Sequence, residues 1–202
     1  MPLQNRVTPD NRIIAEPWRG LMMGNKGGRI HDPETQTLLN RKWASKRWII
    51  CVTEFKERQR QVMGHGYTEL FFMDETSALA AGHRPCFECR RAAANQFAEI
   101  WQECLGVISG SVADGIDKTL HQQRTSPLSN LYDHELKNLP DGTMVRSGKD
   151  CFALKNGQFH EWSGTGYKKK KTVLKNAELL TPRSILAVLE NGYQPVWHPT
   201  IN

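Results

Sequence analysis

The chain has 202 residues, 39% of them hydrophobic, and a formal net charge of +6. This composition excludes global disorder and fits one ordinary domain or two small ones. No stretch approaches the roughly 20 apolar residues of a membrane span, and residues 1–12 lack the pattern of a secretory signal. An odd number of cysteines, five, then favours reduced thiols. We therefore expect a cytoplasmic protein without a membrane partner, and the positive charge favours polyanions such as nucleic acid.

The first third of the chain predicts a small sheet behind an irregular start. Residues 1–20 are polar with scattered prolines, so we expect an irregular arm. Residues 24–28, Gly-Asn-Lys-Gly-Gly, predict a sharp turn. The β-branched and aromatic residues of 47–55 and 67–72 predict strands, and 58–63 is a candidate hairpin partner for the first.

Four helices follow from capping residues and apolar spacing. Asp74 predicts the N-cap of a short helix through Ala81 that Gly82 ends. Apolar residues at helical spacing predict longer helices over 90–105 and 111–123. Thr181 and Pro182 predict the start of a last helix, which ends at Glu190.

The last third adds short strands. Asn156-Gly157 suits the type I′ turn of a hairpin over 151–160, and 172–174 and 178–180 predict two more strands. Together the elements predict an α+β protein in three parts: an α+β unit with its N-terminal arm (1–106), a helical connector (107–140) and a small β-rich C-terminal unit closed by one helix (141–202).

The most informative motif is Arg84-Pro85-Cys86-Phe87-Glu88-Cys89. Two thiolates at Cys-x-x-Cys spacing can bind one tetrahedral cation, so we interpret the pair as half of a structural zinc site. A pair of unmetallated thiols at a helix N-terminus is one alternative. A redox pair is another, although the expected βαβ context is missing.

Zinc needs two further donors, and spacing alone does not select them. Cys51 ends a predicted strand, and His31 follows the glycine-rich turn. His65, between two glycines, and His83, three residues before Cys86, are competitors. Cys104 lies on the apolar face of its helix, which favours a place in the core.

Residues 74–89, with their helix ending in Ala-Ala-Gly followed by Arg-Pro-Cys-x-x-Cys, resemble the Ada-type metal-binding module. The resemblance covers about residues 24–90, and the rest of the chain carries no recognised family pattern. It implies zinc ligands at Cys86 and Cys89, and at His31 after a Gly-Asn-rich turn. The family's next cysteine position is Thr35 here, so Cys51, beyond an inserted segment, completes the hypothesis of a Zn(His31, Cys51, Cys86, Cys89) site.

Basic residues gather between 41 and 60 and around the cysteine pair, with Trp43 and Trp48 interleaved. Basic and aromatic side chains together suit phosphate contacts and base stacking. A solvated strand face with core tryptophans would give the same pattern. The predicted nucleic-acid contacts are Lys46, Arg47, Arg84, Arg90 and Arg91.

The resemblance therefore implies a zinc protein that binds nucleic acid, most simply DNA, in repair or processing. In the Ada family a zinc-bound thiolate accepts a methyl group from a DNA phosphotriester, but that cysteine belongs to a first pair that this chain lacks. One alternative is a hydrolase or nuclease-type enzyme with a purely structural zinc and a site near His121, four residues after Asp117. The other is a non-catalytic interaction module. No nucleotide-binding, metalloprotease or nucleophile-elbow motif is present, and no catalytic residue is predicted.

Overall fold

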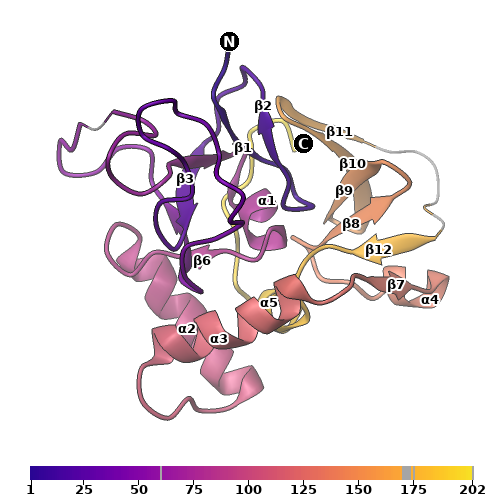
Figure 1. Cartoon of the computed structure of the whole chain (residues 1–202). Helices are drawn as coiled ribbons and strands as arrows, with labels where there is room; N and C mark the ends of the chain where they lie inside the picture. The colour runs from indigo at the N-terminus through magenta and orange to yellow at the C-terminus, as the bar shows by residue number, and fades with distance from the viewer. Residues whose placement is uncertain (60, 170–173, 175, 202) are drawn as a thin grey trace.

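The computed structural model describes residues 1–59, 61–169, 174 and 176–201. These residues form two six-stranded sheets and five helices, which confirms a mixed α+β fold (Figure 1). The strands of the first sheet run in the order β2-β1-β5-β3-β4-β6. They are β1 (Gln4–Val7), β2 (Ile13–Ala15), β3 (Met22–Lys26), β4 (Trp48–Cys51), β5 (Leu70–Phe72) and β6 (Arg84–Pro85).

The second sheet has the order β11-β10-β9-β8-β12-β7. Its strands are β7 (Ser129–Leu131), β8 (Met144–Ser147), β9 (Asp150–Lys155), β10 (Gln158–Ser163), β11 (Gly166–Lys169) and β12 (Ala177–Leu179). The predicted hairpin is confirmed as β9 and β10, and Asn156 and Gly157 have the positive φ values, 50° and 69°, that a type I′ turn requires. Of the strand expected over 172–174, only Leu174 is described, and it lies outside the strands.

The predicted helices form close to their expected bounds. They are α1 (Glu75–Ala80), α2 (Arg91–Leu105), α3 (Val112–Thr125) and α5 (Arg183–Glu190), with a short α4 (Asp133–Leu136) that was not expected. Asp74 caps α1 by accepting the N–H of Ser77 at 2.9 Å. Gly82 follows that helix with φ +77°, as a helix-ending glycine does.

The expectation for the N-terminal segment is wrong. Residues expected as an irregular arm form the antiparallel hairpin of β1 and β2, and β1 pairs with β5. The expected turn at 24–28 is largely strand, because β3 runs to Lys26 between β5 and β4. Gly24 is needed there for space, since a Cβ at this position would lie 2.2 Å from the carbonyl oxygen of Ile49. The described residues of 58–63 form no strand, and Arg60 lies outside the described part.

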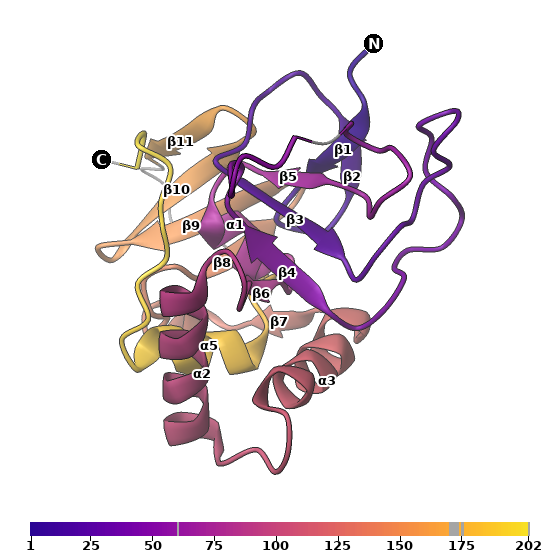
Figure 2. The ribbon, with the colours of Figure 1, turned by 90° about the vertical axis from the view of Figure 1, so that its left-hand side faces the viewer.

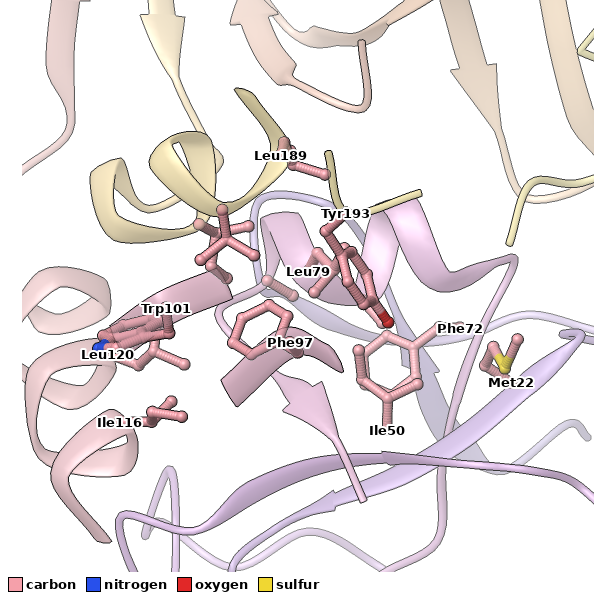
Figure 3. Close-up of a cluster of buried hydrophobic side chains, with 14 of the residues drawn as sticks. Met22, Ile50, Phe72, Leu79, Phe97, Trp101, Ile116, Leu120, Leu189 and Tyr193 are labelled. Carbon is pink, nitrogen blue, oxygen red and sulfur yellow. The ribbon is translucent and has the colours of Figure 1, made fainter. Parts of the chain in front are cut away.

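The main hydrophobic core lies where the first sheet meets the helices (Figure 3). It combines side chains from all three parts that the sequence predicts: the N-terminal unit, which contains the first sheet, the connector and the C-terminal unit. Figure 2 shows α2, α3 and α5 together on one side of the sheets. The core includes Ile50, Phe72, Leu79, Phe97, Trp101, Ile116, Leu120, Ile185, Leu189 and Tyr193. The connector helix and the last helix therefore complete the core of the N-terminal sheet.

A buried carboxylate at the start of α1 fastens the cysteine-rich segment to the C-terminal segment. Glu75 accepts two hydrogen bonds from the guanidinium of Arg90, both 2.7 Å long. It also accepts the hydroxyl of Tyr193 at 2.7 Å and the backbone N–H of Val196 at 2.9 Å. All four donors converge on one carboxylate that is fully buried, so its charge is neutralised inside the protein.

The neighbouring carboxylate, that of Asp74, holds the second sheet in the same way. It accepts the hydroxyl of Tyr167 in β11 at 2.8 Å and the backbone N–H of His198 at 3.1 Å. Burial raises the pKa of Asp74, while these hydrogen bonds and the one from Ser77 oppose that shift. The end of the chain is thus tied to the first turn of α1.

We expect Arg90→Met to lower the free energy of unfolding by about 3–5 kcal/mol, because Glu75 would remain buried without its cation. Arg91→Met is the matched control: the neighbouring side chain is exposed, and its removal should change stability by no more than about 0.5 kcal/mol. Denaturant titration followed by tryptophan fluorescence, at equal metal loading, measures both. Equal effects of the two substitutions would contradict a stabilising role for the ion pair.

Candidate metal centre

The first sheet brings Cys51 beside the Cys-x-x-Cys segment. Cys51 is the last residue of β4, and β6 pairs parallel with β4, with Ile50 opposite Pro85. The backbone N–H of Cys86 continues this pairing by donating to the carbonyl of Ile50 at 2.9 Å. The chain then turns so that Cys89 returns toward the same strand end.

The sulfur atoms of Cys51, Cys86 and Cys89 all lie within 4.8 Å of one another. A tetrahedral zinc ion with Zn–S bonds of about 2.3 Å places its sulfurs about 3.8 Å apart, so the spacing needs only small side-chain adjustments. The backbone N–H of Glu88 donates to the Cys86 sulfur at 3.4 Å, which favours a thiolate there. Three cysteines thus form a cluster that can hold a metal ion.

The three thiols influence one another's pKa values. The pKa of Cys86 is lowered to about 2, because its sulfur accepts hydrogen bonds from Cys51 and Cys89 and from backbone N–H groups. The pKa of Cys51 is raised, because its thiol donates to Cys86 and to Cys89 and is buried. These hydrogen bonds favour a thiolate at Cys86, and a thiolate beside two further sulfurs suits a cation.

All three cysteines line a pocket of about 240 Å³. Within the described residues, no fourth histidine, cysteine or carboxylate joins their cluster. The two carboxylates that line the pocket have other partners: Glu69 accepts the backbone N–H of Met63 at 2.8 Å, and Glu88 pairs with Arg58 at 2.6 Å. A metal ion held by these three cysteines would have three protein ligands among the described residues.

The sequence did not indicate the aromatic part of this pocket. Phe55, Tyr67 and Phe71 line it. Alternation in β5 is the available signal, because Phe71 lies between the buried residues Leu70 and Phe72 and therefore faces the other side of the sheet.

His31, the fourth predicted ligand, lies elsewhere. Its Nε2 hydrogen bonds to the carbonyl of Gly64 at 2.7 Å, so that nitrogen carries the proton, and its Nδ1 lies 2.6 Å from the hydroxyl of Thr68. Both ring nitrogens are therefore engaged in holding loops together. Of the two competitors, His65 is exposed near Glu34, and His83 packs between aromatic rings in the core.

The five predicted nucleic-acid contacts divide into two groups. Arg84 is 3% exposed and donates to both carboxylate oxygens of Asp117, at 3.0 and 2.8 Å, and Arg90 is engaged by Glu75. Lys46, Arg47 and Arg91 are exposed. The pairing of Asp117 with Arg84 also leaves His121 without the carboxylate considered for it; its ring instead packs on Trp43.

Comparison with protein-family models, with curated proteins and with solved structures gave no match. None of the helices in the described part of the chain combines the length and hydrophobicity needed to cross a bilayer. The assignment of a function therefore depends on the geometry of this chain's own residues.

We expect His31→Ala to leave the metal content unchanged, because the imidazole lies outside the cysteine cluster. The same substitution should lower the free energy of unfolding by about 1–3 kcal/mol, since it leaves buried polar groups without a partner. Elemental analysis after dialysis and denaturant titration measure the two effects. A folded His31→Ala protein that no longer holds its metal would restore His31 as a ligand.

Proposed function

We propose that this protein binds one zinc ion through Cys51, Cys86 and Cys89, in an Ada-like module. The observation that supports this most directly is the convergence of the three sulfurs within 4.8 Å. Thiolates select zinc over the hard cations magnesium and calcium. Three protein ligands with an available fourth position are typical of zinc sites that act on a ligand, whereas closed sites with four ligands are structural.

When bound, zinc supplies a Lewis acid and keeps its thiolates deprotonated but nucleophilic. The chain's own contribution is positional. The strand pairing of β4 with β6 fixes Cys51 against Cys86, and the Glu75–Arg90 ion pair anchors the residue that follows Cys89. Phe55, Tyr67 and Phe71 line the pocket into which the three cysteines open.

We propose nucleic acid as the partner of this module. The support is an exposed basic tract before β4, formed by Arg41, Lys42, Lys46 and Arg47, with Trp43 37% exposed among them. Phosphate contacts from such a tract and stacking on an exposed indole are the ordinary means of binding single strands. The net charge of +6 adds long-range attraction.

The available fourth position favours a second candidate, a hydrolase or nuclease-type enzyme. A ligand position on zinc within a pocket can hold water as well as a nucleic-acid atom. The two candidates differ in outcome: a binding module leaves an oligonucleotide intact, whereas a hydrolase cleaves it and becomes inactive when its metal is removed. Incubation of the zinc-loaded protein with single-stranded DNA separates them.

We expect the purified protein to contain one zinc per chain and Cys86→Ser to lose most of it, because the serine hydroxyl replaces a thiolate ligand. Cys104→Ser is the matched control, since Cys104 lies on α2 outside the cluster. Elemental analysis after dialysis against a weak chelator measures both. Zinc content that is the same in the two variants would exclude the cysteine cluster as the site.

We expect binding to single-stranded DNA to weaken as salt rises. A combined Lys42→Ala, Lys46→Ala, Arg47→Ala variant should reduce the slope of log K against log salt by about 0.7 for each phosphate that it no longer neutralises. A variant that removes the same charge from the second sheet, Lys149→Ala, Lys168→Ala, Lys169→Ala, controls for net charge. Identical slopes for the two variants would show that the tract before β4 does not contact phosphate.

A further inference from the structure

The first sheet carries a buried lysine on the face opposite the cysteine pocket. Met23 and Asn25 of β3 line the cysteine pocket, and Lys26, the next residue, lines a different one. Lys26 is 3% exposed, and its Nζ lies 4.7 Å from the ring centroid of Trp48. The same Nζ donates a long hydrogen bond, 3.4 Å, to the carbonyl of Asn11.

No carboxylate of the described residues forms an ion pair with Lys26. Arg84 and Arg90 are also buried, but each of them donates two hydrogen bonds to a carboxylate. An ammonium group that is buried without an anion destabilises a fold. The arrangement therefore points to an anion supplied from outside the chain.

The pocket that Lys26 lines has a volume of about 580 Å³, within the range of small-molecule sites. Its wall is rich in cations and indole rings: Lys26, Arg41, Lys42, Arg124, Trp43 and Trp48. Arg124 lies over Trp48, 3.9 Å from the ring centroid, and its two terminal nitrogens donate to backbone carbonyls. The single carboxylate among the described lining residues, Asp10, is paired with Arg12 at 2.8 Å.

Two buried polar atoms of this wall have no hydrogen-bond partner in the protein. They are Oδ1 of Asn11 and Nε of Arg124. Buried polar atoms are nearly always hydrogen bonded, and a bound water, ion or ligand is one explanation of an exception. Burial, together with the charges of Arg124 and Lys42, lowers the pKa of Lys26 to about 7. A bound anion would reverse this shift by favouring the ammonium form.

We propose that this pocket binds a phosphate group, with Lys26 at its base, Arg124 and Lys42 beside it, and Trp43 available to stack on an attached ring. Several cations around one lysine match a phosphate better than a singly charged carboxylate. The phosphate belongs either to a free nucleotide or to the terminus of a nucleic-acid strand. The sheet separates this pocket from the cysteines, so the proposal does not depend on zinc.

Calorimetric titration and thermal unfolding of the full, zinc-loaded chain test the proposal. The probes are ADP, a 5′-phosphorylated single-stranded oligonucleotide, and the same oligonucleotide with a 5′-hydroxyl. Binding of ADP points to a free nucleotide. Preference for the phosphorylated oligonucleotide over its 5′-hydroxyl form points to a strand terminus. Either result supports the pocket.

Lys26→Met should raise the Tm of the free protein, because it removes an unpaired buried charge, and should weaken binding of the phosphate probe at least about tenfold. Lys149→Met, at an exposed turn of the second sheet, should change neither. Should Lys26→Met fail to fold, Lys42→Met at the exposed edge should still weaken binding several-fold. Absence of binding by all probes, or unchanged affinity in the folded lysine variants at 26 and 42, would overturn the proposal.

Discussion

The buried ion pair between Glu75 and Arg90 is the contact on which the arrangement of the cysteines depends. Arg90 directly follows Cys89, and Glu75 begins the helix that precedes the cysteine pair. The same carboxylate accepts the hydroxyl of Tyr193, which lies 118 residues further along the chain. The cysteine segment is therefore held in part by a segment that the resemblance to an Ada-type module does not cover. A fragment ending at residue 106 would keep Arg90 but lack Tyr193 and Val196, which donate the other two hydrogen bonds to Glu75.

The sequence predicted the elements whose signals are local. Asp74 caps its helix through a residue three positions away, and the Asn156-Gly157 turn joins adjacent strands. The cysteine pair likewise needs only its own spacing. The strand β3 was missed because its sequence, Met-Met-Gly-Asn-Lys, has a weak strand propensity and is selected by tertiary packing: Gly24 allows the backbone of β4 to approach.

The site residues that the sequence misplaced all have distant partners. His31 is engaged by Gly64 and Thr68, 33 and 37 residues away, and Arg84 by Asp117, 33 residues away. A histidine after a glycine-rich turn and an arginine beside a cysteine pair have the same appearance in sequence whether they are bound internally or exposed. Only the placement of their partners distinguishes a structural contact from one that is available to a ligand.

This distinction also identifies which basic residues can serve function. The buried cations Arg84 and Arg90 each donate two hydrogen bonds to one carboxylate of the protein. Lys26 is buried to the same extent as Arg84, yet no described carboxylate pairs with it. Methionine at this position would pack against Trp48 without the cost of desolvating a charge. The presence of lysine at position 26 is therefore better explained by a ligand than by stability. The clustering of basic residues along the sequence does not separate basic residues that bind a ligand from those that stabilise the fold.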